Sequence, residues 1–586
     1  MPTLETEHIR VTFLPAHEQI LLDPGETILG ASQRLGLTLA APCGGSGNCG
    51  KCRMLLKQGR LDETVADRER LSAGERRAGV RLACQAVPDA DCVVEIPESK
   101  PEKGGEILVQ GIATRVAIHP AVRRFDVRTA RPDLAQGASD AELLLAALPA
   151  QVRQISLRLL RQLPGMLRRG DWQARAIVQG ERVIDLLPVS AASRLCGLAI
   201  DLGTTTVVMK WLDLESGEIL ATAAQFNDQK AFGADVIARI AYANAHGVEP
   251  LQSAIIGQLN DMIAQLERET GGSARDIYRI VVAGNTVMQH LFCGLPPRHL
   301  AEMPYVPVVR HYPPLPAAAL GLQAHPEAVV MLMPGLGRFV GGDTAAVLLT
   351  LAAQLQGTWL AVDIGTNGEI LLCHHGRIWT TSAAAGPAFE GAQISSGMRA
   401  VTGAIDRVWW RDGRLQAHVI GEGKARGICG SGLIDAAGAL LEAGWMDYSG
   451  RLQQDQGEVV LRDGVALTQR DMREIQLAKG AIAAAIALLL RAADVSPHDL
   501  ENLYLAGAFG QYIRKEMALR IGLLPPLPAE KIHFIGNAAC AGAELALIST
   551  EEELRMAELA RQVQYVEVAA QEGFQELFAE NMFFPH

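Results

Sequence analysis

The sequence predicts a multidomain protein: a small N-terminal domain with a cysteine cluster, a small α+β domain, and a large two-lobed α/β domain. Three observations predict this arrangement. The chain has 586 residues, several times what one hydrophobic core usually needs. Four of its ten cysteines lie between residues 43 and 84. A strand–turn–strand pattern with an aspartate at the turn occurs twice after residue 196.

Composition narrows the class of protein and its partners. Hydrophobic residues make up 49% of the chain and charged residues 20%, as in an ordinary globular protein. The net charge of −11 and the lack of a long Lys/Arg block argue against a nucleic-acid partner. The N-terminus has no basic region before an apolar run, and the most apolar stretch, residues 481–490, is too short to cross a bilayer. We therefore expect a cytoplasmic protein with no membrane partner, in which thiols stay reduced.

The N-terminal domain begins with two strand-like runs, residues 9–13 and 19–22, followed by helical spacing of apolar residues over 25–35. A glycine-rich loop comes next, over residues 42–52. Glycine lets such a backbone wrap a compact inorganic group and direct amides toward it. A cysteine cluster in a reducing compartment is first interpreted as a metal or redox site.

The cysteine spacing identifies the metal group that we expect. Cys43, Cys49 and Cys52 follow a C-x5-C-x2-C pattern, and Cys84 is a fourth thiol further along. This differs by one residue from the plant-type C-x4-C-x2-C…C pattern and resembles the adrenodoxin branch of ferredoxins. The resemblance implies a β-grasp fold with a [2Fe–2S] cluster on these four cysteines. A zinc site is the alternative, but its usual signature is two short C-x2-C pairs. Cys92 lies in an alternating run and is expected to be a buried strand thiol.

The middle of the chain carries neither cluster nor phosphate signals. A polar, breaker-rich linker precedes it. Helical spacing is found at residues 141–148 and 152–160, and residues 172–184 are typical of a hairpin around Gly180. These patterns predict a small α+β domain. The expected divisions are 1–97 for the ferredoxin-like domain, 98–112 for the linker, 113–195 for the middle domain and 196–586 for the large domain.

Two related hairpins dominate the large domain. Residues 198–209 and 360–371 each run from an apolar strand through Asp-x-Gly-Thr into a second strand, with Asp201 and Asp363 at the turns. One copy could be an ordinary tight hairpin. Two copies indicate a duplicated fold whose halves face each other across a cleft. Backbone amides and threonine hydroxyls of the turns can bind a polyphosphate, and each aspartate can hold Mg²⁺ directly or through water.

This pair of hairpins resembles the phosphate loops of the actin, hexokinase and heat-shock-chaperone ATPase superfamily. The resemblance implies an actin-like ATPase built from a duplicated ribonuclease-H-like fold. Residues 341–346 and 536–543 resemble its two inter-lobe connections, and 505–510 its adenosine-contacting turn. Turns 283–286 and 427–432 precede helical runs and suit either anion binding or close strand-to-helix packing. The predicted nucleotide-binding residues are Gly203, Thr204, Thr205, Gly284, Asn285, Thr286, Gly342, Asp343, Gly365, Thr366, Asn367, Gly368, Gly430, Ser431, Gly507 and Gly510.

A ferredoxin module fused to this ATPase resembles one family, the reductive activators of corrinoid enzymes. Residues 385–397 and 504–510 are the stretches that favour this family over a generic kinase. The resemblance implies that a [2Fe–2S] cluster accepts an electron from a reduced ferredoxin, a flavodoxin or a reductase. It further implies ATP-dependent transfer to an inactive Co(II) corrinoid protein of a methyltransferase system, which restores Co(I). In the family the region 113–195 is implied to form a homodimer.

Three carboxylates are the candidate catalytic residues. Asp201 and Asp363 are assigned to Mg²⁺ and to orienting the attacking water. Glu390 is a further candidate, although an acidic residue in a glycine-rich loop can also cap a helix.

Two alternative functions stay open. The first is an ATP-driven electron donor to another acceptor, as in the activators of 2-hydroxyacyl-CoA dehydratases, which carry their cluster on cysteines of the ATPase part. The cysteines of that part here are scattered: Cys196, Cys293, Cys373, Cys429 and Cys540. The second is a small-molecule kinase with a redox-sensing ferredoxin domain, which would need a catalytic base that the sequence does not identify.

Overall fold

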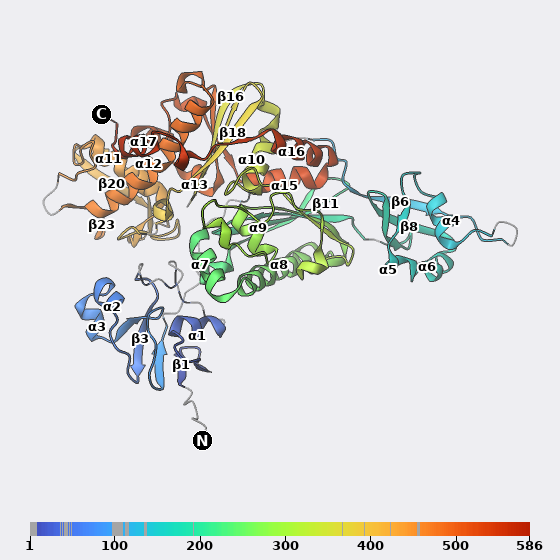
Figure 1. Cartoon of the computed structure of the whole chain (residues 1–586), viewed down its shortest axis with the longest axis horizontal. Helices are drawn as coiled ribbons and strands as arrows, with labels where there is room; N and C mark the ends of the chain where they lie inside the picture. Colours follow the sequence, from blue (N-terminus) through green and yellow to red (C-terminus); the bar gives the residue numbers. More distant parts are fainter. Residues whose placement is uncertain are drawn as a thin grey trace.

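In this computed structural model the sheets occur along the chain in the order of the predicted domains (Figure 1). The structure describes residues 9–35, 37, 39, 41, 45, 47, 50–96, 109, 111, 116–133, 137–191, 193–365, 367–391, 393–421, 423–453 and 457–585.

The N-terminal domain is a five-stranded sheet in the order β2-β1-β5-β3-β4. The first and last strands along the chain pair in parallel, and a helix crosses between them, so the predicted β-grasp fold is confirmed. Val11, Phe13 and Val94 point from β1 and β5 into its core. Its elements are β1 Arg10–Leu14, β2 Glu18–Leu21, α1 Ile28–Arg34, β3 Arg53–Gln58, α2 Val65–Arg70, α3 Ala73–Arg77, β4 Val80–Leu82 and β5 Cys92–Glu95.

The middle domain is a four-stranded sheet in the order β6-β8-β9-β7 with three short helices. Gly180, at a φ of 58°, makes the predicted turn between β8 and β9. The predicted helix over 152–160 is wrong in its first part. Gln154–Ile155 is a strand, β7, and the helix begins only after Ser156, whose hydroxyl accepts from the Leu159 amide. The elements are β6 Val122–Arg128, α4 Asp140–Ala146, β7, α5 Leu157–Leu160, α6 Leu163–Arg169, β8 Gln173–Gln179 and β9 Arg182–Leu187.

The first lobe of the large domain is a six-stranded sheet in the order β12-β11-β10-β13-β15-β14. Strands β10, β11 and β12 are antiparallel, whereas β13 and β15 continue the sheet in parallel with β10. Its elements are β10 Cys196–Leu202, β11 Thr206–Asp213, β12 Ile219–Phe226, η1 Asp228–Ala231, α7 Val236–His246, α8 Glu249–Thr270, η2 Ala274–Asp276, β13 Ile277–Ala283, α9 Thr286–Phe292, η3 Arg298–Leu300, β14 Leu315–Pro316, η4 Ala317–Leu320 and β15 Val329–Leu332.

The second lobe repeats this topology. Three antiparallel strands, β16 to β18, are followed by β24 and β25 in parallel with β16, so the predicted duplication is confirmed. Its sheet elements are β16 Thr358–Ile364, β17 Gly368–His374, β18 Arg377–Ala383, β24 Asn502–Ala506, β25 Ile532–Gly536 and β26 Gln564–Tyr565. Around them lie η5 Ala352–Gln354, η6 Pro387–Glu390, β19 Ala404–Arg411, β20 Arg414–Val419, β21 Gly427–Ile428, α11 Gly430–Glu442, β22 Glu458–Arg462, β23 Val465–Thr468, α12 Gln469–Ala492, η8 Pro497–Asp499, α13 Gly507–Tyr512, α14 Lys515–Arg520, η9 Ala529–Lys531, η10 Val568–Ala570 and α17 Phe574–Met582.

Two helices pack against each other where the lobes meet: α10, Gly342–Thr350, and α15, Ala538–Ile548. Helix α16, Thr550–Gln562, follows α15. A Cβ on Gly542 would lie 2.2 Å from the Ala346 carbonyl oxygen, so only glycine allows this close approach. Buried side chains from both lobes share the surrounding core.

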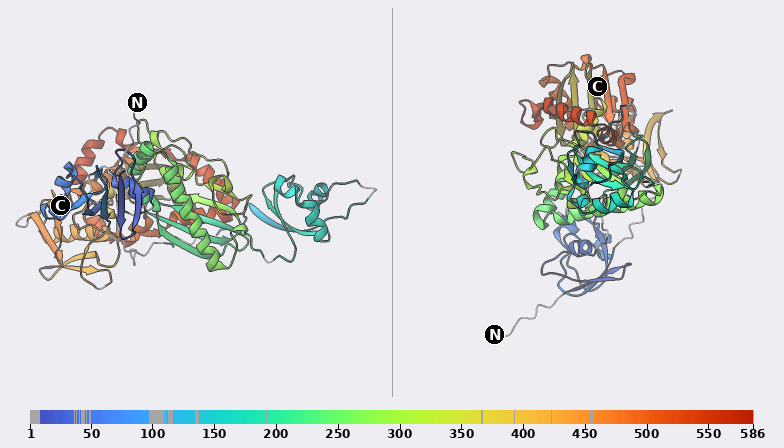
Figure 2. Two further views of the ribbon diagram at one scale, coloured as in Figure 1. Left: turned by 90° about the horizontal axis from the view of Figure 1, so that it is seen from below. Right: turned by 90° about the vertical axis from the view of Figure 1, so that its right-hand side faces the viewer.

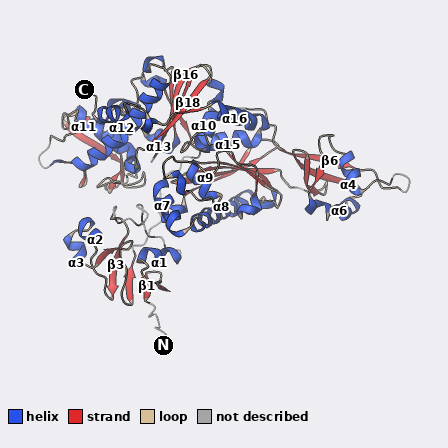
Figure 3. Ribbon diagram, viewed as in Figure 1, coloured by secondary structure: helices blue, strands red, loops and turns tan. Residues whose placement is uncertain are grey.

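The remaining views place the parts in space. Figure 2 shows the middle domain projecting from the two-lobed body, and Figure 3 shows helices flanking the sheets of both lobes. In the described part of the chain, α12 is long and apolar enough to span a membrane, but 72% of its most apolar 18-residue stretch is buried inside the protein. It is a core helix of the second lobe.

Candidate active site

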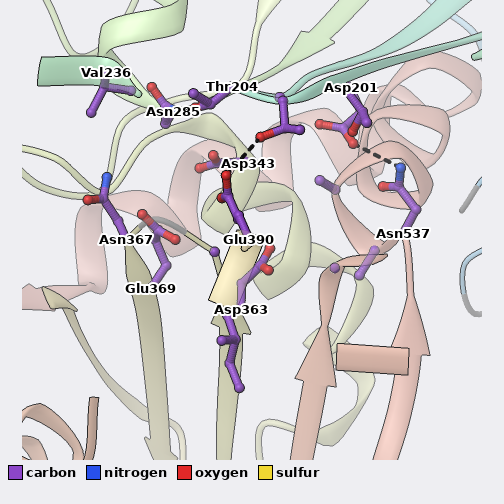
Figure 4. A pocket seen from close by; sticks show the side chains of 18 residues that line it. Asp201, Thr204, Val236, Asn285, Asp343, Asp363, Asn367, Glu369, Glu390 and Asn537 are labelled. Carbon is purple, nitrogen blue, oxygen red and sulfur yellow. Dashed lines mark hydrogen bonds between the residues drawn. The ribbon is translucent and has the colours of Figure 1, made fainter. Parts of the chain in front are cut away.

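A pocket between the two lobes collects most of the polar residues that the sequence singled out (Figure 4). One wall comes from the turn after β10 and the other from the turn after β16. The connecting helices α10 and α15 contribute Asp343 and Asn537. The pocket is lined by Asp201, Gly203, Thr204, Thr205, Thr206, Val236, Asn285, Asp343, Asp363, Ile364, Gly365, Asn367, Glu369, Glu390, Gly507, Asn537, Ala538 and Ala539.

The turn after β10 is held from behind by the first lobe. The backbone amide of Asn227 donates to the Thr205 carbonyl at 2.9 Å, and its side-chain amide donates to the Gly203 carbonyl at 2.8 Å. Arg239 donates from Nη2 to the Thr204 carbonyl at 2.6 Å. The carbonyl oxygens of this turn, which would repel a phosphate, are therefore engaged inside the lobe.

Arg239 is fully buried beneath this turn. Burial lowers the pKa of its guanidinium to about 10, so it remains charged at neutral pH. Its other donors reach the Gly233 carbonyl at 3.0 Å and the Gln229 side chain at 3.3 Å. A fixed positive charge therefore lies directly behind the turn that faces the pocket.

The two predicted aspartates lie on opposite walls and are positioned by different neighbours. Asp201 Oδ2 accepts a 2.8 Å hydrogen bond from the side-chain amide of Asn537 (Figure 4). Asp363 lies against Gly507, where a Cβ would come within 2.3 Å of Oδ1. Gly507 has a φ of 77°, a conformation that also favours glycine. The turn after β24 therefore packs directly on Asp363 only because residue 507 has no side chain.

The pocket holds more acidic groups than it can easily keep ionised. Burial, together with nearby carboxylates, raises the pKa of Asp201 and of Asp363 to about 7. Burial raises the pKa of Asp343 to about 6, although Thr344 hydrogen bonds oppose the shift. The pKa of Glu369 is raised well above its ordinary value by burial and by Asp343 and Asp363. A cation in this pocket would relieve the repulsion and favour the ionised forms.

These carboxylates do not form a ready-made cage. Within the described residues, no three His, Cys, Asp or Glu side chains are grouped closely enough to hold a metal ion by themselves. Mg²⁺ is typically bound through one or two carboxylates together with water and substrate phosphates. The donor set therefore suits a cation that arrives with a polyphosphate.

Glu390 connects the two walls. It ends the short helix η6 of the second lobe, and Thr205 of the first lobe donates from its hydroxyl to Glu390 Oε2 at 3.5 Å. The side chain points toward the space between the aspartates (Figure 4). Glu390 is therefore in a position to respond to closure of the lobes.

The structure brings some predicted residues together and leaves others elsewhere. Gly284 contacts β10 from behind, and its carbonyl accepts from the Gly342 amide at 2.8 Å. A Cβ on Gly432 would lie 2.3 Å from the Ile405 carbonyl oxygen, so close packing accounts for a glycine at this position of α11. Thr366 lies outside the described residues. The predicted residues that do not line the pocket are Gly284, Thr286, Gly342, Gly368, Gly430, Ser431 and Gly510.

The predicted residues do not include Glu369 and Asn537, which line the pocket, or Arg239, which lies behind the turn after β10. Glu369 faces Asp363 across the β16–β17 ladder, and an acidic residue at the start of an apolar strand could have indicated it. Asn537 is the N-cap of α15, and its position before an apolar helix is a helix-cap signal. Arg239 gives no local signal, because it reaches the turn across 35 positions of sequence.

The N-terminal domain contains the second candidate site. Cys52 and Cys84 are both buried. The Ala83 amide donates to the Cys52 carbonyl at 2.9 Å, which places the two cysteine-bearing segments side by side. Gly45, Gly47 and Gly50 have positive φ, as expected for a backbone that wraps a compact group. Cys43 and Cys49 lie outside the described residues.

Cys92 differs from the predicted ligands. It lies in β5 within the core of the domain, and burial raises the pKa of its thiol to about 11. It is thus suited to packing, as predicted, and not to the thiolate form that metals bind.

Family models match nearly the whole chain. Residues 11–89 match the 2Fe-2S iron-sulfur cluster binding domain, and 112–192 match the RACo linker region. Residues 196–356 match the RACo middle region, and 357–586 match the C-terminal domain of RACo, the ASKHA domain.

Individual relatives agree with these models. The corrinoid activation enzyme RamQ of Eubacterium limosum is 32% identical, over 98% of this chain and 99% of its own. A Methanosarcina barkeri protein named [Co(II) methylated amine-specific corrinoid protein] reductase is 31% identical over 63% of this chain and 72% of its own. The solved structure of a reductive activator for corrinoid,iron-sulfur protein covers 99% of this chain and 98% of its own, with 32% identity and a TM-score of 0.73.

Proposed function

The chain belongs to the RACo family of reductive activators, and we propose on that premise that it uses ATP to reactivate a corrinoid protein. In this proposal one electron passes, by way of a [2Fe–2S] cluster, to an inactive Co(II) corrinoid protein of a methyltransferase system. The product is the Co(I) form that accepts a methyl group.

The observation that carries the proposal is the joining of two sites in one chain. A β-grasp domain places Cys52 beside Cys84, and a two-lobed domain places acidic groups around a pocket between its lobes. The chain is similar to RamQ and to the solved reductive activator over nearly their whole length, which supports a shared activity. When bound, the cluster supplies a one-electron carrier and Mg²⁺ supplies positive charge for the phosphates.

The residues of the pocket have separate tasks in this proposal. Thr204 and Thr205 hold phosphate oxygens, supported by the charge of Arg239 behind them. Asp201 and Asp363 hold Mg²⁺, directly or through water, and orient the attacking water. Glu390, which accepts from Thr205 across the lobes, reports whether the lobes are closed.

Closure is how ATP can do work on a bound partner. A ligand shifts a conformational equilibrium only by its difference in affinity for the two states. ATP and its hydrolysis products would favour different lobe arrangements around α10 and α15, whose contact at Gly542 is tight. A corrinoid protein docked on the lobes would then be moved between a resting and an electron-accepting arrangement.

Donor, location and assembly are also part of the proposal. The electron would come from a reduced ferredoxin, a flavodoxin or a reductase in the cytoplasm. A homodimer would form through the middle domain, residues 113–195. That domain projects from the body of the protein (Figure 2), and Leu157 and Leu160 on its helix α5 are 61% and 40% exposed.

Anaerobic optical spectroscopy tests the proposal. The reduced protein is mixed with a Co(II) corrinoid protein, with and without Mg-ATP. We expect the Co(I) absorption band to grow only with Mg-ATP. Cobalt that stays Co(II) with every corrinoid partner, despite an intact cluster and active ATP hydrolysis, would direct the search to another electron acceptor.

A further inference from the structure

The described residues of the segment that joins the ferredoxin domain to the middle domain contact both ends of helix α15. We call residues 97–121, between the end of the β-grasp core and β6, the tether. Gly111 forms an isolated antiparallel bridge with Gly536, immediately before the helix begins. His119 bonds to the other end: its amide donates to the Ile548 carbonyl at 2.9 Å, and its carbonyl accepts from the Thr550 amide at 2.9 Å.

The contact at Gly111 requires glycine. A Cβ at this position would lie 2.6 Å from the Asn537 carbonyl oxygen and 2.9 Å from the Ala541 Cβ. Such distances cannot be accommodated unless the tether or the start of α15 moves. Val116 packs on the core shared by α10 and α15, so the seat of the tether extends beyond one residue.

Asn537 stands between this seat and the nucleotide pocket. Its backbone carries the Gly111 contact, whereas its side chain bonds in other directions. Oδ1 accepts from the Cys540 amide at 2.8 Å and caps α15, and Nδ2 donates to Asp201 Oδ2 at 2.8 Å. The helix is also fixed to the first lobe by a 2.6 Å ion pair between Lys210 and Glu544. A shift of residue 537 therefore changes how Asp201 is held while the rest of α15 stays anchored.

We propose that Asn537 is a positioning residue for the nucleotide site, and that the seating of the ferredoxin tether on its backbone through Gly111 sets its position. The hydrogen bond to Asp201 is then the link by which lobe closure and the ferredoxin connection affect each other. This inference rests on the proposed ATP hydrolysis. It goes beyond it in assigning an effect on that reaction to the tether, whose described residues do not line the pocket.

Two substitutions separate the roles of the residues. Asn537→Asp keeps an oxygen that can cap α15 but removes the N–H donor and puts a like charge beside Asp201. Gly111→Ala adds one Cβ outside the pocket. Gly257→Ala is the matched control, because a Cβ at Gly257, in α8, would meet nothing within 4 Å.

The assay is steady-state Mg-ATP hydrolysis by the full chain at a series of ATP concentrations, without a corrinoid partner. For Asn537→Asp we expect kcat to fall about tenfold or more, since misplacing a reacting group by ~1 Å can cost up to ~100-fold. Asp201 loses the hydrogen bond that positions its carboxylate. The loss should appear in kcat more than in the KM for ATP, because Thr204 and Thr205 remain in place to hold the phosphates.

The decisive result is the behaviour of Gly111→Ala. We expect a smaller fall in kcat, again with little change in the KM for ATP, and Gly257→Ala unchanged. The double variant Gly111→Ala/Asn537→Asp should be no slower than Asn537→Asp alone, because residues acting through one contact are not additive. Val116→Ser, which loosens the same seat without a clash, should lower kcat in the same way if Gly111→Ala proves unstable.

The outcomes distinguish this inference from the proposed function. If the wild type is active but Gly111→Ala and Val116→Ser match it, the inference alone is overturned. The same holds if the fall in kcat of the double variant equals the product of the falls in Gly111→Ala and Asn537→Asp. A wild-type chain that hydrolyses no Mg-ATP overturns the proposed function and this inference with it.

Discussion

Replacing Asp363 by asparagine should stabilise the nucleotide-free protein at alkaline pH. The Asp363 carboxyl is surrounded by Asp343, Asp201 and Glu369, and burial raises its pKa from 3.8 to about 7. A raised carboxyl pKa means that the folded state binds a proton more tightly than the unfolded state. The folded protein is therefore favoured below pH 3.8, and this advantage is lost as the pH rises through 7. Asparagine at position 363 has no charge to bury, so Asp363→Asn does not lose stability in this way.

The magnitude follows from the shift. About three pKa units correspond to about 4 kcal/mol, which is a ceiling because Asp363 remains partly exposed to the pocket. Between pH 5.5 and 8.5 we expect the wild type to lose about 2 kcal/mol relative to Asp363→Asn. Mg-nucleotide should reverse the order of stability, because only the wild type retains the carboxylate that would hold the cation.

Urea unfolding at a series of pH values measures the difference. The transition to follow is the one whose midpoint Mg-ADP raises, because several domains need not unfold together. Asp412→Asn is the control, since the Asp412 side chain is 85% exposed on a turn. Parallel stability curves for the wild type and Asp363→Asn across this pH range would show that the pocket does not strain its carboxylates, and would refute the electrostatic argument.

Three further predictions follow from the contacts. Cys52→Ser or Cys84→Ser should abolish the visible absorption of the cluster but leave Mg-ATP hydrolysis intact. Cys92→Ser should keep the absorption. Equal spectra for all three variants would contradict the ligand assignment. Gly542→Ala should lower the free energy of unfolding of the ATPase domain by about 1–3 kcal/mol, because its Cβ would meet the Ala346 carbonyl oxygen at 2.2 Å. A melting temperature equal to that of Gly257→Ala would contradict this. Arg239→Lys keeps the charge but loses donors to the turn after β10, so the KM for ATP should rise about tenfold. Arg298→Lys, on a side chain 65% exposed, should leave the KM unchanged. An unchanged KM in Arg239→Lys would remove its positioning role.

Local patterns were sufficient for the fold. Apolar alternation and Asp-x-Gly-Thr turns are short-range signals, so the hairpins with Asp201 and Asp363 at their turns could be placed and their duplication recognised. The helix predicted over 152–160 failed in its first part because apolar spacing alone does not distinguish a short strand from a helix. There, pairing of Gln154–Ile155 with β9 decides the outcome, and that partner lies distant in sequence.

The site was predicted less completely than the fold. Residues on the turns themselves, such as Thr204 and Gly365, lie in the pocket because the turns do. Asn537 and Arg239 enter through contacts over 336 and 35 positions of sequence, which no local pattern encodes. Gly430 begins α11 and does not line the pocket, and close packing against β19 accounts for the nearby Gly432. The roles assigned to the pocket residues and to the cluster cysteines stay predictions.

The central claim is that one chain couples electron transfer to ATP. Stopped-flow absorption tests it most directly, with the cluster and cobalt bands followed together after the reduced protein and a Co(II) corrinoid protein are mixed with Mg-ATP in the absence of any other reductant. The account predicts that cluster oxidation and Co(I) formation proceed at one rate and in equal amounts, only with ATP, and that both are lost in Asp363→Ala and in Cys49→Ser. Co(I) that forms equally well without ATP, or ATP hydrolysis that leaves both bands unchanged, would contradict it.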